Sequence, residues 1–426
     1  MEPDLTEQAR RALAEKNYDL ALQLFTQVLS RSEGQTPLNY SKASFAAARK
    51  QEYKKAFSWA SKAFEMAPEQ PEVQTALAWA LYLYIHHLGE KADPKFIITW
   101  ITRIKTIEND GIKKPFGLAV IQSIPRLLKM ESPPFLSMIQ WLMQIDPEVL
   151  SDKPLVINPN GNNTLELASY REMLWAQRTQ VLFEASRFEE CIETCKQALE
   201  QPFQWHYRND IWIYRRMALS HQALNDLNEA LNIYKQVLIS QPDWFIHYEY
   251  SKILYQSGES SLALHEAVKA LMAEGAISSK IHLIHHTATI LEAQNRKEEA
   301  REHKMLRNAI YREKGWRSCE HDEPGNIELT ESSQTIYHRL RKMWNKILLE
   351  NSPKFEGVII KINEGGLSGF ILTPDKKSYY FSKADWCSKS DVPAKGMKVF
   401  FRIAKRKHPK THEPVDNAIL VEPAEK

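Results

Sequence analysis

The sequence predicts a mostly helical protein that ends in a small five-stranded β-barrel. Two observations lead to this fold class. Along much of residues 1–314, small and apolar residues recur at spacings of four and three, which marks one buried stripe on each helix. From Phe355 onward the spacing changes to the two-residue alternation of strands, and Gly and Pro residues separate the segments. A chain of 426 residues is long enough for several domains.

A repeated helical pattern occupies residues 1–71 and 166–314. In each copy a small anchor residue is followed, four positions later and again three after that, by an apolar or small residue. A partner helix precedes the copies and carries an aromatic or apolar residue near its start. The anchors are Ala21, Ala56, Cys191, Ala230, Ala263 and Ala300, and the partner-helix residues are Tyr40, Trp175, Tyr214, His247 and Ile284.

This pattern resembles the tetratricopeptide repeat, a helix-turn-helix unit of 34 residues. The family's small residue and terminal proline are present as Ala56 with Pro68 and as Ala230 with Pro242. The family's Leu-Gly pair is mostly absent, and the resemblance covers about half of the chain. It implies an α-solenoid of helix pairs whose extended concave surface binds a partner protein.

Residues 72–165 separate the two arrays and predict an irregular helical region. Isoleucines from Ile97 to Ile107 line one helix face, and prolines, including Pro115 and Pro125, are expected to cut the remainder into short helices. Residues 151–165 are rich in Asn, Pro and Gly, so we expect a surface loop there. Residues 315–350 predict a linker followed by an amphipathic helix over 334–350, which packs on the repeats, packs on the barrel, or joins the two.

Residues 351–426 predict the barrel, because five short strands in about 70 residues fit an OB-type fold. Turn residues lie at Gly365-Gly366, Pro374-Asp375 and Gly396. The expected strands are Glu356–Ile362, Gly369–Thr373, Ser378–Ser382, Lys398–Ala404 and Val415–Val421.

The order and spacing of these strands resemble the cold-shock domain over roughly residues 355–423. The family's Asn-to-Ile spacing is present as Asn363 and Ile371, and its Thr-Pro-Asp follows at residues 373–375. Its aromatic strand ending in Phe-Ser is present at residues 379–382, and its Gly-x-x-Val-x-Phe strand at residues 396–401. The resemblance implies that aromatic side chains stack on the bases of single-stranded nucleic acid.

Only part of the family's aromatic platform is present. Phe370, Tyr380 and Phe381 match its positions, whereas Ser368, Ser378 and Lys361 stand where the family has aromatic residues. Since each stacked base contributes about 1–3 kcal/mol, we expect weak binding that tolerates many sequences. Residues 355–426 hold 13 Lys or Arg against 9 Asp or Glu, which favours phosphate contacts. The predicted nucleic-acid-binding residues are Lys361, Phe370, Tyr380, Phe381, Lys405, Arg406, Lys407 and Lys410.

The second array predicts a groove for a partner protein. Its aromatic and basic residues Trp175, Trp212, Tyr214 and Arg215 are candidates for the lining. The alternative is that the tryptophans are repeat core. The barrel aromatics have a similar alternative, because an OB-type barrel also serves as a structural or protein-docking module.

Few motifs point to chemistry. We find no phosphate-binding Gly-rich loop and no nucleophile elbow, so we expect a protein that is not an enzyme and needs no cofactor. Four cysteines in this length predict no disulfide framework. Cys191 with Cys195, and His282 with His286, have the spacing of helical metal ligands, but packing is the simpler interpretation.

The most apolar run, Ala76–Ile85, is too short to span a bilayer, and no signal peptide is apparent at the N-terminus, so we expect a cytoplasmic protein. Together these expectations describe a non-enzymatic adaptor that binds a partner protein through its repeats and single-stranded RNA or DNA through its barrel. By analogy, it would be a subunit of a nucleic-acid-processing or defence complex. The alternative is a protein-interaction scaffold that binds no nucleic acid.

Overall fold

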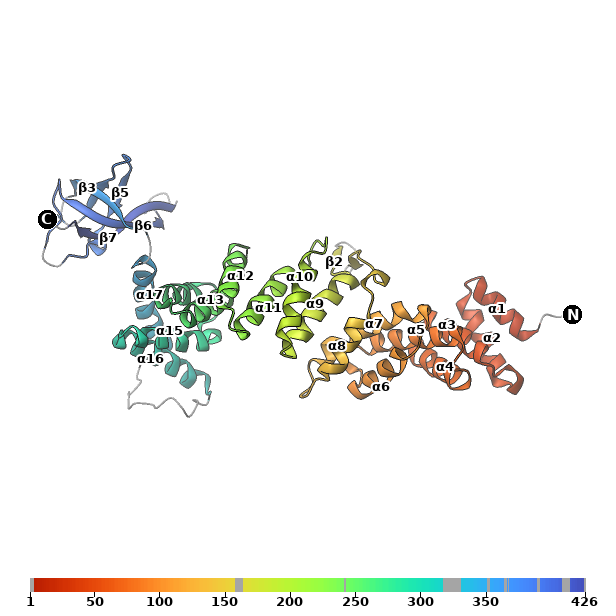
Figure 1. Cartoon of the computed structure of the whole chain (residues 1–426). Coiled ribbons are helices and arrows are strands. Elements are labelled where there is room, and N and C mark those ends of the chain that lie inside the picture. Colours follow the sequence, from red (N-terminus) through yellow and green to blue (C-terminus); the bar gives the residue numbers. More distant parts are fainter. Residues whose placement is uncertain are drawn as a thin grey trace. The chain divides into compact units, whose positions relative to one another are not determined.

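The computed structural model describes the chain except residues 1–3, 158–163, 241–242, 317–330, 351–352, 364–365, 367, 389–390, 408–413 and 425–426. It divides into two compact units, Met1–Tyr234 and Lys235–Lys426. Helices precede residue 351 almost without exception, and the β-barrel follows it (Figure 1).

The first unit is an array of helices. Its helices are α1 (Leu5–Ala14), α2 (Tyr18–Ser30), α3 (Pro37–Arg49), α4 (Tyr53–Met66), α5 (Pro71–Leu88), α6 (Pro94–Lys105), α7 (Asp110–Leu127), α8 (Phe135–Gln144), α9 (Tyr170–Glu184), α10 (Phe188–Leu199), α11 (Asn209–Ala223) and α12 (Leu227–Ser240), the last of which contains the boundary between the units.

Successive helices pack as pairs. α1 contacts α2, α3 contacts α4, and α9 contacts α10. The first helix of one pair also contacts the first helix of the next pair: α1 contacts α3, α3 contacts α5, and α9 contacts α11. This is the packing of a tetratricopeptide-like solenoid, in which first helices share one face, so the predicted fold class is confirmed.

The predicted anchor residues explain how closely the helices approach. All six anchors are buried, with exposed fractions of 0–1%. Helix starts follow local chemistry as well: the Thr36 hydroxyl accepts a hydrogen bond from the Asn39 N–H at 3.3 Å, and Pro37 occupies the first turn of α3. Small anchors and capped starts together set the register of each pair.

The expectation that prolines break residues 110–127 into short helices is wrong. α7 runs through both Pro115 and Pro125. A proline inside a helix costs about 3 kcal/mol, because it removes one backbone hydrogen bond and crowds the carbonyl four residues earlier. α7 offsets this cost by burying much of its surface, including Phe116, Val120 and Ile124, against neighbouring helices.

Two short strands occupy described residues at either end of the surface loop expected at residues 151–165. β1 (Leu155–Ile157) pairs with β2 (Leu165–Leu167) in a two-stranded antiparallel sheet. The residues between the two strands lie outside the described part of the chain. Apolar residues on each side of the Asn- and Gly-rich segment, Leu155 to Ile157 on one side and Leu165 with Leu167 on the other, account for the pairing.

The second unit begins with further helices of the array. They are α13 (Trp244–Gln256), α14 (Ser260–Met272), α15 (Ile281–Ala293), α16 (Lys297–Lys314) and α17 (Ser333–Glu350). α13 pairs with α14 and α15 with α16, while α17 packs on α14 and α16. Of the arrangements left open for the helix at 334–350, packing on the repeats is therefore the observed one.

One buried hydrogen bond fixes α17 on α16. The Trp344 indole N–H donates to His303 Nε2 at 2.8 Å, and His303 Nδ1 bonds the Glu299 carbonyl at 2.7 Å. Because an indole N–H can only donate, Nε2 must be unprotonated and Nδ1 must carry the proton. Both side chains are fully buried, and burial lowers the pKa of His303 to about 4.

The barrel has five strands: β3 (Phe355–Ile362), β4 (Gly369–Leu372), β5 (Ser378–Phe381), β6 (Lys398–Lys407) and β7 (Pro414–Pro423). They close in the order β3-β4-β5-β7-β6, and all neighbouring pairs are antiparallel except β5 with β7. The predicted strands are thus confirmed to within a few residues. The core of the barrel contains Ile359, Ile371, Phe381, Val399, Phe401, Ala418 and Val421.

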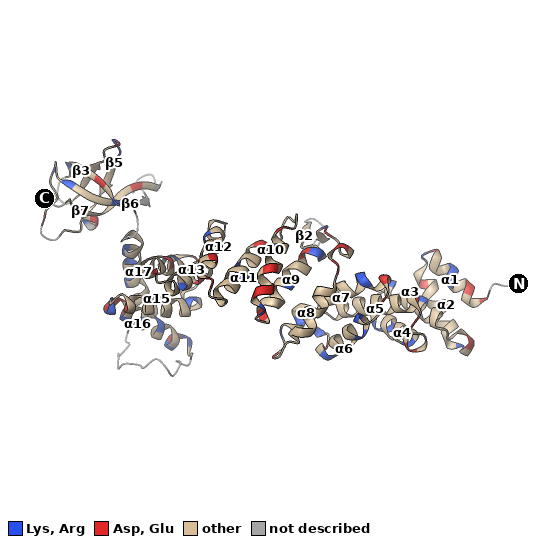
Figure 2. Ribbon diagram, viewed as in Figure 1, with Lys and Arg blue, Asp and Glu red and all other residues tan. Residues whose placement is uncertain are grey.

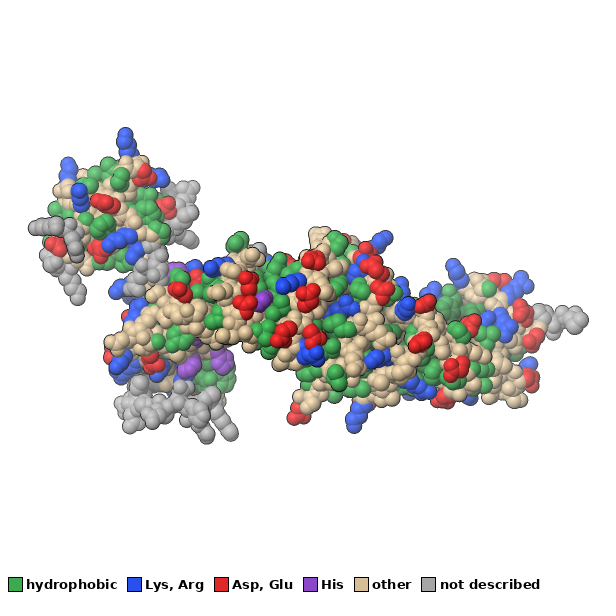
Figure 3. All heavy atoms as spheres, in the orientation of Figure 1, with side chains coloured by type: hydrophobic (Ala, Val, Ile, Leu, Met, Phe, Trp, Pro, Cys, Tyr) green, Lys and Arg blue, Asp and Glu red, His purple; other side chains and the backbone are tan. Residues whose placement is uncertain are grey.

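Charge is unevenly distributed over the described surface. Acidic side chains gather over α9 and α10 on the face drawn in Figure 3, and hydrophobic side chains lie among Lys and Arg on the barrel. The positions of these charges along the ribbon can be followed in Figure 2. Within the described residues, every helix is either too short or too polar to cross a membrane.

Candidate functional site

A row of side chains crosses the outer surface of three adjacent barrel strands. Lys361 on β3 pairs with Phe370 on β4, and Phe370 pairs with Tyr380 on β5. Residues directly opposite on antiparallel strands project from the same face of the sheet. The Phe370 and Tyr380 ring centroids are 5.5 Å apart, and Tyr380 is 37% exposed. The half-buried Phe370 ring, the exposed Tyr380 ring and the exposed Lys361 side chain thus lie side by side, and we call them the outer row.

A β-bulge brings Lys361 into this row. Ile359 is buried in the barrel, and regular alternation would place Lys361, two residues later, on the same inner face. The register shifts between Ile359 and Lys361, so one extra residue, Ile360, enters the strand. Ile360 and Lys361 are therefore both exposed, while Ile362 returns to the core.

Gly369 allows the strands to approach closely beside the bulge. A Cβ atom at Gly369 would lie 2.1 Å from the carbonyl oxygen of Lys361 and 3.1 Å from the Phe381 ring. No side chain fits at that distance, so glycine is required where β4 begins. This close approach fixes the backbone of Lys361 and hence its place in the outer row.

The outer row extends to a residue that sequence reasoning missed. Asn417 on β7 pairs with Tyr380 in the parallel part of the sheet, and it also pairs with Ala404 on β6. The Asn417 side chain is half-buried. An amide at this position adds a hydrogen-bonding group at the end of a row that otherwise offers rings and one charge.

Other predicted nucleic-acid-binding residues fall elsewhere. The inclusion of Phe381 is wrong, because its side chain is fully buried among the core residues of the barrel. Alternation explains this, since Phe381 follows the outward-facing Tyr380. Lys405, Arg406 and Lys407 lie on β6, paired with β7 residues 416, 415 and 414, but their side chains are not described. Lys410 lies outside the described residues.

The predicted groove of the second array is only partly open. Trp212 is 37% exposed on α11, with the Arg215 guanidinium 5.5 Å from its ring centroid, and Tyr214 is half-buried. The placement of Trp175 in an open groove is wrong, because that side chain on α9 is only 7% exposed. Trp175 packs with Arg178, whose guanidinium lies 4.9 Å from its ring centroid.

An apolar groove lies in the N-terminal array, where no sequence pattern indicated one. It has a volume of about 760 Å³ and is lined by α1, α3 and α5, the first helices of three successive pairs. Apolar residues of its lining include Leu38, Phe45, Trp79 and Leu83, and Lys42 and Arg49 add positive charge. Phe45 is 50% exposed, which leaves an aromatic surface open to a ligand.

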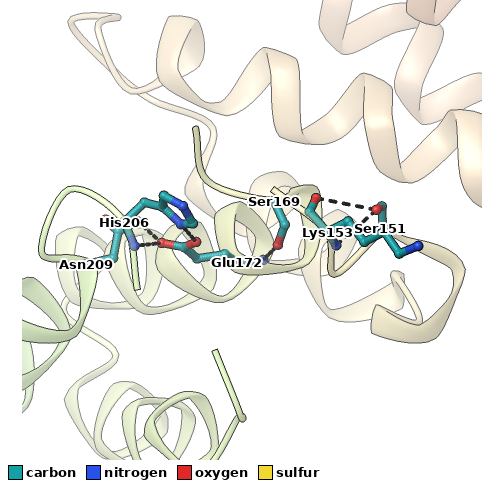
Figure 4. Close-up of polar contacts among 6 residues, drawn as sticks. All are labelled: Ser151, Lys153, Ser169, Glu172, His206 and Asn209. Carbon is teal, nitrogen blue, oxygen red and sulfur yellow. Dashed lines mark hydrogen bonds and ion pairs between the residues drawn. The ribbon is translucent and has the colours of Figure 1, made fainter. Parts of the chain in front are cut away.

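A buried carboxylate organises the turn between α10 and α11 (Figure 4). Glu172, near the start of α9, accepts hydrogen bonds from the His206 N–H, from His206 Nδ1 and from Asn209 Nδ2, each at 2.8 Å. The Ser169 hydroxyl caps the same helix by accepting from the Glu172 N–H at 3.1 Å. Because both carboxylate oxygens of Glu172 are bonded to the turn, we interpret this cluster as a structural clamp.

The candidate metal pairs have ordinary packing partners. The sulfur atoms of Cys191 and Cys195 are 3.9 Å apart and buried, and the hydrogen bond with Cys191 together with burial raises the pKa of Cys195. His286 Nε2 bonds the Ser251 hydroxyl at 3.1 Å. Within the described ranges, no group of three or more His, Cys, Asp or Glu side chains is placed to hold a metal ion.

Comparisons with known proteins find similar solved structures, but no match at the level of sequence. No protein-family model matches the chain, and no curated protein matches it either. Similar solved structures include the APC/C hetero-tetramer Cut9–Hcn1, with 12% identity, a TM-score of 0.30, and coverage of 60% of this chain and 46% of that one. The match therefore spans less than half of that protein's length.

Two further structures resemble the helical part. BtubC from P. vanneervenii has 9% identity and a TM-score of 0.34, over 66% of this chain and 97% of its own. Pseudomonas aeruginosa PilF has 11% identity and a TM-score of 0.28, over 67% of this chain and 99% of its own. At these values the matches carry no functional argument, and the fold rests on the helix pairing of this chain.

Proposed function

We propose that this protein is a non-enzymatic adaptor, which docks a partner protein on its helical array and contacts single-stranded nucleic acid with its barrel. The observation that carries the nucleic-acid half is the outer row, with Lys361, Phe370 and Tyr380 side by side on β3, β4 and β5. Stacking on exposed rings is tolerant of base sequence, and a lysine adds a phosphate contact.

The barrel topology supports this use of the outer row. The strand order and the parallel β5–β7 pairing are consistent with an OB-type barrel, and such barrels bind oligonucleotides on the face of their second and third strands. Here those strands are β4 and β5, which carry Phe370 and Tyr380. Two rings give a small platform, so the affinity is modest and depends on salt.

Nucleic-acid binding is tested by fluorescence anisotropy with labelled single-stranded RNA and DNA of about 20 nucleotides, longer than the ~4–16 nucleotides that one OB barrel covers. We expect the double variant Phe370→Ala, Tyr380→Ala to weaken binding at least about tenfold, because two stacking surfaces are lost. Val415→Ala, an exposed β7 residue outside the row, is the control and should bind as the parent does.

A wild-type chain that binds neither oligonucleotide would remove nucleic acid from the proposal. The scaffold alternative would then gain, and one observation favours it independently. Val358 and Ile360, which are 37% and 39% exposed, add apolar surface to β3. Exposed apolar side chains beside a row of rings also suit a docked protein.

The protein-binding half rests on the groove between α1, α3 and α5. Its volume lies within the ~300–1,000 Å³ of typical ligand pockets, and its apolar lining with Lys42 and Arg49 suits a segment that carries apolar and acidic side chains. Affinity capture from a cell lysate with the full chain tests this. We expect wild type to retain partner proteins that are absent with Phe45→Ala. The control Leu136→Ala removes an exposed apolar side chain on α8 and should retain the same proteins as wild type.

A further inference from the structure

Helix α17 carries positive charge that is only partly paired with acidic side chains among the described residues. It contains four Lys or Arg, and its only acidic residue is the last one, Glu350. Blue residues recur along its ribbon in Figure 2. The opposite side of the helix is apolar and is buried against α14 and α16, with Ile336, Leu340, Trp344 and Ile347 at exposed fractions of 0–1%.

The burial of the apolar side fixes which residues face outward. His338, Arg341, Lys342, Asn345 and Lys346 are all exposed. Their spacings of three, four and eight residues place them on one surface of the helix. Since Trp344 is anchored by its hydrogen bond to His303, α17 cannot rotate to hide this surface without breaking that buried hydrogen bond.

Few of these charges are neutralised within the described part of the chain. Arg339 forms ion pairs with Glu302 and Glu331, at 2.7 and 2.9 Å. For Arg341, Lys342 and Lys346, no ion pair with an acidic side chain is present among the described residues. Uncompensated positive charges on a fixed helix repel one another slightly, which lowers the stability of the unbound chain. An anionic partner removes this repulsion.

The distance along the chain places this cationic surface near the barrel. α17 ends at Glu350 and β3 begins at Phe355. Five residues span at most about 18 Å when fully extended, whatever the orientation of the two parts. The outer row itself offers two rings but one cation, Lys361. A strand whose bases stack on the row therefore needs phosphate contacts that lie beyond it.

We propose that Arg341, Lys342 and Lys346 on α17 contact the sugar-phosphate backbone of the single-stranded nucleic acid whose bases stack on Phe370 and Tyr380. This inference rests on the proposed function and extends it: the binding surface has a base-stacking part on the barrel and a phosphate-binding part on the last helix of the array. Charge complementarity and the short connection favour nucleic acid over an acidic protein segment.

The test measures the affinity of the full chain for a single-stranded oligonucleotide across a series of salt concentrations. The triple variant Arg341→Gln, Lys342→Gln, Lys346→Gln should reduce the slope of log K against log salt by about 0.7 for each phosphate that is no longer neutralised, up to about 2 in all. The control Lys54→Gln, Lys95→Gln, Lys114→Gln removes the same charge from exposed sites in the first unit and should leave the slope unchanged.

Two further variants separate the possible causes. Arg341→Lys, Lys342→Arg, Lys346→Arg keeps all three charges and should retain the parent slope, which would show that the slope follows the charge at these positions and not the identity of the side chains. Phe370→Ala, Tyr380→Ala should lower the affinity at every salt concentration and leave the slope unchanged, because stacked rings release no counterions.

The outcomes distinguish this inference from the proposed function. If the α17 Gln variant keeps the parent slope and affinity while the ring variant loses binding, the inference is overturned and the proposed function stands. If the wild-type chain binds no oligonucleotide, both fail. Displacement of the labelled oligonucleotide by polyglutamate of equal charge at a lower concentration than unlabelled oligonucleotide requires, with this preference lost in the α17 Gln variant, would assign the α17 surface to acidic polypeptides and also overturn the inference.

Discussion

At the scale of single residues, His303 holds the last two helices of the array together. Its ring accepts from the indole of Trp344 and bonds the Glu299 carbonyl, so both nitrogens are satisfied inside the protein. A buried polar group of this kind stabilises only while both partners are present. The hydrogen bond to Trp344 also sets the rotation of α17 and therefore which side chains of that helix reach solvent.

We expect Trp344→Phe to weaken the packing of α17 on α16. The substitution keeps an aromatic ring but leaves His303 Nε2 buried without a donor, which costs about 1–3 kcal/mol in addition to the smaller ring area. Hydrogen exchange of α16 and α17 peptides, followed by mass spectrometry, measures the effect locally. Unchanged protection of these peptides would contradict the role given to this hydrogen bond.

The stability of the same region should depend on pH. Burial lowers the pKa of His303, and likewise of His286, to about 4. Below about pH 6.5 the unfolded chain binds protons that the folded chain does not, so this part of the stability is complete above 6.5 and is lost as the pH falls toward 4. Each histidine contributes up to about 1.4 kcal/mol per pH unit in that window.

The measurement is hydrogen exchange of α15–α17 at pH values from 4.5 to 7, corrected for the intrinsic pH dependence of exchange. Protection of these helices should fall toward acid pH. Helices α3 and α4, in which no buried histidine occurs, are the internal comparison. Equal pH dependence in both places would contradict the assignment to the two histidines.

Residue-level detail in the barrel was only partly predictable. Alternation predicts which side of β4 and β5 faces outward, and it correctly exposes Tyr380. It places Lys361 on the wrong side, because a bulge at Ile360 cannot be read from a run of branched apolar residues. Phe381 belongs to the core by the same alternation that exposes Tyr380, in agreement with the structural alternative given above for the barrel aromatics.

At the scale of elements, helix pairs were predictable because their signal is local. The spacing of a small anchor and its apolar followers lies within one helix, and so do the caps that start it. Breaker residues were less informative. Pro115 and Pro125 lie inside α7. The sequence shows the energetic cost of a proline within a helix, but it does not show the contacts with neighbouring helices that outweigh this cost.

The anchor positions give a sharp prediction about helix pairing. Ala263 is fully buried, and its carbonyl accepts the Ser251 hydroxyl at 2.7 Å across α13 and α14. We expect Ala263→Leu to force the two helices apart at a cost of about 1–3 kcal/mol, seen as a lower thermal midpoint of the second unit.

The adjacent residue provides a matched control for that experiment. Leu262 lies on the same helix and is 48% exposed. Leu262→Ala is therefore the reverse substitution at a position with little packing. Its midpoint should stay close to that of wild type. A similar shift for both variants would mean that the small side chain at Ala263 does not govern the pairing.

At the scale of the whole molecule, the candidate surfaces belong to different parts of the chain. The apolar groove is built by α1, α3 and α5, whose lining residues span roughly residues 13 to 83. No local pattern marks such a groove, because each helix contributes only a few side chains to it. The barrel surface was easier to predict, since three short strands supply it within about 20 residues.

Coupling between α17 and the barrel gives a prediction at this scale. Inserting about 25 Gly and Ser residues between Glu350 and Phe355 would lengthen the connection from at most about 18 Å to a mean span near 27 Å with wide fluctuations. The effective concentration of one surface at the other then falls, and we expect oligonucleotide affinity to drop several-fold.

Combining that insertion with the three Gln substitutions on α17 tests the coupling. If the two surfaces act together, the combined variant should bind only slightly more weakly than the Gln variant alone. Independent, multiplicative losses of affinity would show that the insertion acts by another route. Anisotropy titrations of the four chains at one salt concentration are sufficient.

The closure of the barrel limits how it can recognise anything. Each of its five strands has a neighbouring strand on both sides, so the closed part of the sheet offers little edge to which an extended peptide could add as a further strand. We therefore expect a binding partner to be held mainly by side chains on the outside of the barrel and by its loops. Affinity at this module is consequently open to gradual tuning, one surface substitution at a time, without disturbing the backbone pairing that keeps the sheet closed.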